Sequence, residues 1–309
     1  MILCVTANAA VDKTLVVSPF RLDEIHRPQS VLALAGGKGC NVARALKTLS
    51  EQALVTGWVG GFAGQFIEHG LQAEGIETAF VHTGAESRTC LSILDPEAGT
   101  MTEIYEKGEP VSSEKVHELI ERFGQLVSRC RAVVLSGSLP AGVPPDFYAQ
   151  LIRIAHLANI PVYLDASGEA LRQGIEAQPD LIKPNKQEFA HFVGGDLDSL
   201  DGYAAAAIEV ATRYKTKVVL SLGADGALMA AGSQLLRARP PQVTITSAVG
   251  SGDSLVAGLL YASGADVREQ LRCGVAAGTA NALRLGAGVF TREDFERIYA
   301  GVTVDSLKE

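Results

Sequence analysis

The sequence predicts an α/β protein built on a doubly wound, mainly parallel sheet. Short apolar runs typical of buried strands alternate along the chain with amphipathic stretches typical of helices, and this alternation is the pattern of strand-helix-strand units. The chain has 309 residues, of which 47% are hydrophobic, so it can bury a large core. In such a sheet the functional loops are expected at the carboxyl ends of the strands.

The apolar runs that we expect to form buried strands are Ile2–Thr6, Ala132–Ser136, Val162–Asp165, Leu181–Lys183 and Lys217–Leu222. The stretches that we expect to form helices, from their apolar spacing, are Gly39–Leu49, Gln65–Glu74, Ser113–Arg129, Pro144–Leu157, Leu200–Tyr214, Gly252–Ala262, Val267–Arg284 and Arg292–Ala300. No internal repeat, low-complexity tract or linker interrupts this order, so we expect residues 1–309 to form one domain.

Two segments break the alternation. Residues 14–34 and 88–106 each contain paired β-like runs with no helix between them. We expect both excursions to leave the main sheet as hairpins and to form a small β-sheet lid over a cleft. A lid suits a reaction from which water must be kept out.

Charge and cysteine content exclude several classes of protein. Lys plus Arg is 27 and Asp plus Glu is 35, a net charge of -8, which argues against a nucleic-acid partner. The five cysteines contain no CxxC pair and are expected to be reduced thiols of a cytoplasmic protein. The N-terminal stretch lacks the pattern of a signal peptide, and no apolar run is long enough to predict a membrane partner.

The most informative motif is residues 248–254, Ala-Val-Gly-Ser-Gly-Asp-Ser, which directly precede a buried helical run. Glycines at a helix start let backbone N–H groups converge on an anion, and the helix dipole adds to the attraction. The carboxylate of Asp253 at the same junction can accept a proton from a hydroxyl group. The alternative interpretation is a glycine-rich helix start with Asp253 as an ordinary cap. The first interpretation predicts phosphoryl transfer to an alcohol.

Four further motifs accompany this one in a characteristic order. They are Gly36-Gly37-Lys38-Gly39-Cys40-Asn41, Ser136-Gly137-Ser138-Leu139-Pro140, Lys183-Pro184-Asn185-Lys186-Gln187-Glu188 and Ser221-Leu222-Gly223-Ala224-Asp225-Gly226. On these motifs the chain resembles the PfkB, or ribokinase-like, carbohydrate kinases over nearly its whole length. The resemblance implies a ribokinase-like fold with a β lid, ATP as phosphoryl donor, and a catalytic Asp at the position of Asp253.

Within this family the chain is most similar to the branch that acts on phosphorylated ketohexoses. The stretch from Asn8 to Asp12 resembles that branch's Asn-Pro-x-x-Asp, although Ala9 replaces the usual Pro, and Ser251 stands where the wider family more often has Ala. The resemblance implies a tagatose-6-phosphate kinase, which converts D-tagatose 6-phosphate to the 1,6-bisphosphate. The alternatives are a 1-phosphofructokinase, which phosphorylates fructose 1-phosphate, and a non-catalytic sugar-phosphate sensor on a kinase fold.

The resemblance also assigns expected roles to individual residues. The proposed catalytic group comprises the base and the turn that holds the moving phosphoryl group: Asp253, Gly250, Ser251 and Gly252. The expected sugar-phosphate contacts are Asp12, Arg27, Gly36, Gly37, Lys38, Asn41, Arg88 and Ser138. Arg27 and Arg88 indicate a phosphorylated substrate, because guanidinium groups match phosphate oxygens; both could equally be exposed surface arginines.

The expected contacts to ATP come from the later motifs: Lys183, Asn185, Ser221, Gly223 and Gly226. Asn185 and Glu188 stand one helical turn apart, and we expect them to hold Mg²⁺ through water, because that ion prefers oxygen ligands and retains water. The small residues Gly274–Gly278 could flank adenine or simply pack in a buried helix.

The small lid sheet also predicts a homodimer. One face of the lid can close over the sugar, and the other is expected to carry apolar residues such as Val16, Leu32 and Ile104, or their alternating neighbours. So small a sheet has too little core to cover both faces, so the second face is expected to be buried against another copy of the chain.

Overall fold

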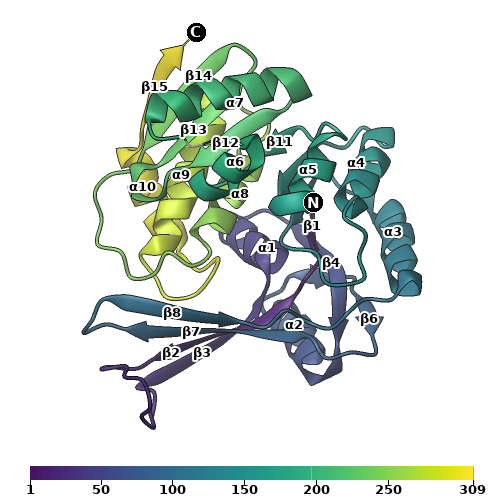
Figure 1. Ribbon diagram of the computed structural model, residues 1–309, viewed down its shortest axis with the longest axis vertical. Coiled ribbons are helices and arrows are strands. Elements are labelled where there is room, and N and C mark those ends of the chain that lie inside the picture. Colours follow the sequence, from purple (N-terminus) through teal and green to yellow (C-terminus); the bar gives the residue numbers. More distant parts are fainter. Residues whose placement is uncertain (196, 309) are drawn as a thin grey trace.

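A computed structural model describes residues 1–195 and 197–308 as a large sheet with a smaller sheet beside it (Figure 1). The large sheet has the strand order β15-β14-β13-β12-β11-β10-β9-β1-β4-β5, with β6 also paired to β4. Its parallel part is formed by β1 (Ile2–Thr6), β4 (Ala53–Gly60), β5 (Glu77–Thr78), β6 (Val81–Thr83), β9 (Ala132–Ser136), β10 (Val162–Asp165), β11 (Leu181–Ile182) and β12 (Lys217–Ser221). The antiparallel extension is β13 (Ala227–Ala231), β14 (Gln234–Arg239) and β15 (Thr303–Lys308). The mainly parallel sheet is therefore confirmed.

Helices cover both faces of this sheet, as the doubly wound prediction requires. One face is covered by α1 (Lys38–Thr48), α2 (Gly61–Ala73), α8 (Ser251–Tyr261), α9 (Val267–Ala282) and α10 (Arg292–Gly301). The other is covered by α3 (Ser113–Val127), α4 (Phe147–Leu157), α5 (Gly168–Ile175), α6 (Lys186–Val193) and α7 (Leu200–Tyr214). Side chains of β1 alternate between the two cores: Ile2 and Cys4 enter the first, Leu3 and Val5 the second. Among the described residues, no helix combines the length and the apolar character needed to cross a membrane.

The second sheet is the predicted lid. It has the order β3-β2-β7-β8, from β2 (Ala10–Val16), β3 (Ser30–Gly36), β7 (Arg88–Asp95) and β8 (Thr100–Tyr105). Two hairpins, β2–β3 and β7–β8, are joined through the parallel pair β2–β7. In Figure 1 this sheet extends away from the main body, beneath the ends of α8 and α9.

Several elements differ from the sequence-based expectation. Strand β4 was not predicted, because Thr56 and Gly57 interrupt its apolar run; yet every residue of β4 is buried. Gly57 permits this, since a Cβ there would lie 2.0 Å from the Thr6 carbonyl oxygen of β1. The short helices α5 and α6 and the antiparallel strands β13, β14 and β15 were also missed. The lid strand β2 begins at Ala10, four residues before the expected excursion, so Asp12 lies on the lid and not in a turn after β1.

Candidate active site

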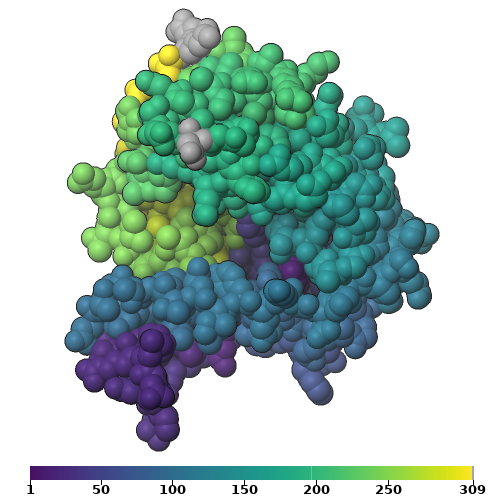
Figure 2. Space-filling model, viewed as in Figure 1, coloured from purple at the N-terminus to yellow at the C-terminus, as the bar shows by residue number. Residues whose placement is uncertain are grey.

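A cavity of about 1250 Å³ lies between the lid and the main body. Figure 2 shows the corresponding hollow between the lid, drawn in blue and purple, and the yellow-green C-terminal part of the body. Two helices begin at its wall, α1 after Gly37 and α8 after Gly250, and both glycines have a positive φ, 96° and 79°. Because helix N-termini present unpaired N–H groups, both ends favour an anion in the cavity.

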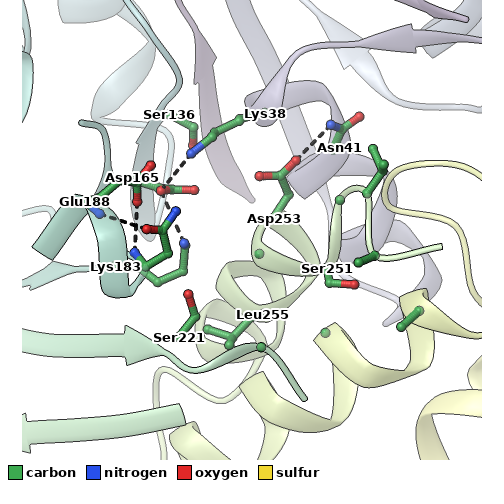
Figure 3. Close-up of a pocket in the computed structure, with 18 of the residues that line it drawn as sticks. Lys38, Asn41, Ser136, Asp165, Lys183, Glu188, Ser221, Ser251, Asp253 and Leu255 are labelled. Carbon is green, nitrogen blue, oxygen red and sulfur yellow. Dashed lines mark hydrogen bonds and ion pairs between the residues drawn. The ribbon is translucent and has the colours of Figure 1, made fainter. Parts of the chain in front are cut away.

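Asp253 projects from the first turn of α8 into this cavity (Figure 3). It is only 6% exposed, and its Oδ2 accepts a hydrogen bond from Asn41 Nδ2 at 2.8 Å. Burial raises the pKa of Asp253 to about 7, against the opposing influence of Lys38 and the Asn41 hydrogen bond. The carboxyl group can therefore take up and release a proton near neutral pH, as a general base must.

The glycine-rich turn is held from behind by Asn281, which sequence reasoning missed. Its amide nitrogen donates to the Val249 carbonyl at 2.8 Å, and its amide oxygen accepts from Gly288 N at 2.7 Å. Within the turn, Ser251 N donates to the Ala248 carbonyl at 3.1 Å. The Ser251 N–H thus has a partner within the turn, whereas the Gly252 and Asp253 amides belong to the first helical turn, which presents N–H groups without helical partners.

A cluster of three charges lies across the cavity from Asn41 (Figure 3); Asp165 and Lys183 are buried, and Lys38 is partly exposed. Lys38 Nζ and Lys183 Nζ lie 3.1 and 3.4 Å from the same oxygen, Oδ1, of Asp165. Burial alone would raise the pKa of Asp165, but the two lysines outweigh it and hold that pKa below its ordinary value. Burial would lower the pKa of Lys38, but the carboxylates of Asp165, Asp253 and Glu188 raise it, so Lys38 stays cationic. The cluster supplies fixed positive charge beside Asp253.

The acidic Asp12 reaches the cavity from lid strand β2. Burial raises its pKa, and hydrogen bonds from the Gly37 backbone and the Asn41 side chain oppose that rise. Asn41 therefore lies between two carboxyl groups, those of Asp12 and Asp253. Gly36 does not line the cavity but leaves room for Asp12, because a Cβ at Gly36 would lie 2.1 Å from Asp12 Cγ.

We expect Gly36→Ala to displace Asp12 while leaving the fold intact, because Gly36 has no positive φ. If Asp12 binds the sugar, losing a charge-assisted hydrogen bond should raise the sugar KM roughly tenfold or more. The KM for ATP should hardly change. Gly124→Ala on α3 is the matched control, since a Cβ there meets nothing within 4 Å. Equal kinetics in both variants would contradict the role of Asp12.

Arg88 is the cation that the lid brings to the cavity wall. Its guanidinium donates to the Asn8 carbonyl at 3.2 Å and to the Glu106 carbonyl at 3.0 Å, and Asn8 Nδ2 donates to Ser138 Oγ at 3.3 Å. Arg88 and Ser138 thus lie together, as expected. Arg27 does not: it is exposed in the loop between β2 and β3 and lies outside the described cavity wall.

The opposite part of the cavity is formed by the expected nucleotide motifs. Ser221, Gly223 and Gly226 line it at the end of β12, and a parallel bridge joins Ser221 to Asn185. Val275 and Gly278 of α9 also line it, and Val275 is buried in the core together with the intervening Ala276 and Ala277. Contact of this run with adenine stays a prediction. Their neighbours on the wall are Pro240, Pro241, Gln242, Val243, Ile245, Thr279 and Ala282.

Asn185 and Glu188 form a capping box at the start of α6. Asn185 Oδ1 accepts from Glu188 N at 2.8 Å, and Glu188 Oε2 accepts from Asn185 N at 2.9 Å. The described residues contain no group of three or more His, Cys, Asp or Glu that could enclose a metal ion. Both residues nevertheless line the cavity, so the site fits an ion held mainly by water and phosphate oxygens, as Mg²⁺ prefers.

Sequence reasoning missed several polar residues of the cavity wall. Asp165 is the last residue of β10, at the carboxyl end of a strand, where functional loops were expected. Its Oδ2 and Ser136 Oγ are buried and have no hydrogen-bond partner among the described residues. Glu103 and Tyr105 line the cavity from β8, where the alternation of a half-exposed strand could have placed them.

A buried proton acceptor beside two helix N-termini, enclosed under a β lid with fixed cations, defines a small-molecule kinase of the ribokinase-like fold. An Agrobacterium tumefaciens protein described as a candidate ribokinase has this fold, with a TM-score of 0.81 at 20% identity over 97% of each chain. The family model described as pfkB family carbohydrate kinase matches residues 3–293. The chain belongs to the pfkB family of carbohydrate kinases.

Solved structures of this family resemble the chain along nearly its whole length. Phosphofructokinase-2 from Escherichia coli, in complex with potassium, is 30% identical, with a TM-score of 0.89 over 97% of this chain and 98% of that one. A possible 1-phosphofructokinase from Thermotoga maritima is 28% identical, with a TM-score of 0.92 over 100% of both chains. The structural relatives therefore come from the phosphosugar branch that the sequence motifs indicated.

Proposed function

We propose that this protein is an ATP-dependent kinase of a phosphorylated ketohexose, with D-tagatose 6-phosphate as the acceptor and the 1,6-bisphosphate as the product. The observation that carries the proposal is the place of Asp253, buried at the start of α8 in a cavity that the lid and Arg88 share. The phosphofructokinase names of the relatives support a phosphorylated acceptor. One of these relatives also makes 1-phosphofructokinase the second candidate.

In the proposed reaction, Asp253 accepts the proton of the sugar C1 hydroxyl while that oxygen forms a bond to the γ-phosphorus of ATP. The bond between this phosphorus and the β–γ bridging oxygen breaks, and ADP leaves with the electron pair. Lys38 and the first-turn amides of α8 stabilise the negative charge of the moving group. The lid brings Asp12 and Arg88 to the sugar and excludes water.

Asn185 and Glu188 are the residues that would hold Mg²⁺, through water. When bound, the ion would neutralise phosphate charge. The capping box fixes both side chains at the start of α6, so the chain's own contribution is a rigid pair of oxygen groups facing the triphosphate end of the cavity.

A panel of acceptors tests the proposal directly. Purified protein with ATP and Mg²⁺ would be assayed for ADP release with D-tagatose 6-phosphate, D-fructose 6-phosphate, D-fructose 1-phosphate and unphosphorylated D-fructose. We expect the highest kcat/KM for D-tagatose 6-phosphate; the highest value for D-fructose 1-phosphate would establish the second candidate. Turnover of the unphosphorylated sugar alone would refute both. Binding of sugar phosphates without turnover would instead support a sensor.

We also propose that the protein forms a homodimer through its lids. Register and alternation put Val16 and Leu32 on the face of the lid that carries Asp12, so these two residues do not belong to the outer face. The neighbouring Val31, together with Ile104, lies on the outer face, and each is 56% exposed. An Escherichia coli phosphofructokinase-2 relative is described as a tetrameric inhibited form, which supports assembly in this branch.

We expect Ile104→Asp to dissociate the dimer and to raise the sugar-phosphate KM before it unfolds the main body, because each lid would brace its partner. Light scattering at micromolar concentration measures the assembly, and initial rates measure the KM. Leu157→Asp is the matched control, since Leu157 is 86% exposed on α4, outside the lid. A fully active wild-type monomer at that concentration would refute the proposal.

A further inference from the structure

One buried arginine behind the cavity makes contacts that the reaction described above does not use. Arg44 lies one helical turn after Asn41 on α1, and it is 7% exposed. Its five N–H donors all have partners. Nε and Nη2 bind the two carboxylate oxygens of Glu74 at 2.7 and 2.8 Å, which fixes the plane of the guanidinium group.

The remaining donors reach three different parts of the site. Nη2 donates to the Ala35 carbonyl at 2.7 Å, at the base of lid strand β3. Nη1 donates to the Ala287 carbonyl at 3.0 Å and to Asn41 Oδ1 at 3.3 Å. Ala287 in turn supports the glycine-rich turn, because a Cβ on Gly250 would lie only 2.5 Å from Ala287 Cα. Arg44 therefore contacts the lid, the support of the glycine-rich turn, and the residue that binds Asp253.

The contact with Asn41 decides which way that amide points. An asparagine amide has an accepting oxygen on one side and a donating nitrogen on the other. Because Arg44 offers only donors, it holds Asn41 Oδ1, and Nδ2 is left facing the carboxyl groups of Asp253 and Asp12. In the reversed orientation, the amide oxygen would face those carboxylates and repel their ionised forms.

We infer that Arg44 is a positioning residue for phosphoryl transfer: it keeps the donating side of the Asn41 amide on the Asp253 carboxylate, and it joins that support to the base of the lid. This inference rests on the proposed function, in which Asp253 is the general base. Three other charged groups also face Asp253. Lys38 comes from α1, Lys183 from the segment after β11, and Asp165 from β10. Their charges act on Asp253 without going through Arg44.

The test is the pH dependence of kcat/KM in Arg44→Lys, which keeps the charge and loses the planar fork. The Asn41 hydrogen bond lowers the pKa of Asp253, so its loss should raise that pKa and move the acid limb of the kcat/KM profile upward by about one pH unit. Misplacement of the base should also lower kcat at the plateau by roughly tenfold to a hundredfold. The KM for ATP should stay near the wild-type value.

Three further measurements distinguish positioning of Asp253 by Arg44 from a general effect on protein stability. Arg122→Lys is the matched control, since Arg122 donates to the Phe80 carbonyl at 2.8 Å far from the cavity wall. Glu74→Gln keeps Arg44 but weakens the ion pair that fixes its guanidinium group, so it should move the acid limb in the same direction. This variant carries the test if Arg44→Lys fails to fold. In an Asn41→Ala background, Arg44→Lys should move the limb no further, because the two residues act through one contact.

An unchanged limb in folded Arg44→Lys and in Glu74→Gln would overturn the inference, as would an equal additional movement in the Asn41→Ala background. These outcomes differ from a failure of the proposed function, which would show as an absence of kinase activity in the wild-type protein itself.

Discussion

Asp253→Asn is expected to lower kcat by about 10²–10⁴-fold, because the substitution keeps the shape of the side chain and removes the proton acceptor. The amide can still occupy the same place in the first turn of α8, so the fold should be retained. Nucleotide affinity should change little, because the expected nucleotide contacts lie on other elements. Steady-state kinetics give kcat, and titration calorimetry with ATP gives the affinity.

Asp253→Asn should also abolish the acid limb of the wild-type pH profile. Burial raises the pKa of Asp253 to about 7, so the wild-type base is protonated and inactive below that pH and becomes active as the pH rises through it. The wild-type kcat/KM should therefore fall tenfold per pH unit well below pH 7, while the residual activity of the variant should not follow that slope. A variant turnover within a factor of three of the wild type would remove Asp253 from the mechanism.

The parts of the fold that sequence could predict are those with a uniform local signal. The run Ile2–Thr6, apolar up to its last residue, became β1 without a change of bounds, and Leu200–Tyr214 became α7 in the same way. Strand β4 carries no such signal, because its interior contains Gly57. This glycine allows β4 to lie close to β1, a contact that only the folded chain contains. The pattern of apolar and polar residues did not reveal β13 and β14. These two strands are defined by their pairing with each other, which exists only in the folded chain.

The site residues divide in the same way, into those marked by a local motif and those whose role depends on contacts between distant segments. Gly250 and Asp253 could be assigned from a short motif, since the turn and the helix start are local. The contribution of Asp165 depends on two lysines from distant elements, and that of Arg44 on a carbonyl 243 residues away at Ala287. Arg27 stays a prediction: its residue type suits phosphate, but it is exposed on the loop between β2 and β3, outside the described cavity wall.

Arg88→Ala is expected to raise the KM for the sugar phosphate roughly ten- to a hundredfold and to leave the KM for ATP nearly unchanged. A charge-assisted hydrogen bond contributes about 1.5–3 kcal/mol, and the guanidinium is the cation that the lid places on the cavity wall. Arg88 donates to the Asn8 and Glu106 carbonyls, so the guanidinium is held at the cavity by the chain itself.

Three comparisons separate phosphate binding by Arg88 from support of the lid. Arg153→Ala removes an exposed cation from α4, outside both the lid and the cavity wall, so it should leave both KM values unchanged. Arg88→Lys keeps the charge without the fork and should recover only part of the affinity. Arg27→Ala tests the remaining sequence-based assignment: a comparable rise in its sugar-phosphate KM would mean that the exposed loop reaches a site in solution. If Arg88→Ala raised both KM values equally, the role of Arg88 would be to support the lid through its bonds to the Asn8 and Glu106 carbonyls. The phosphate would then have to be bound by other cations.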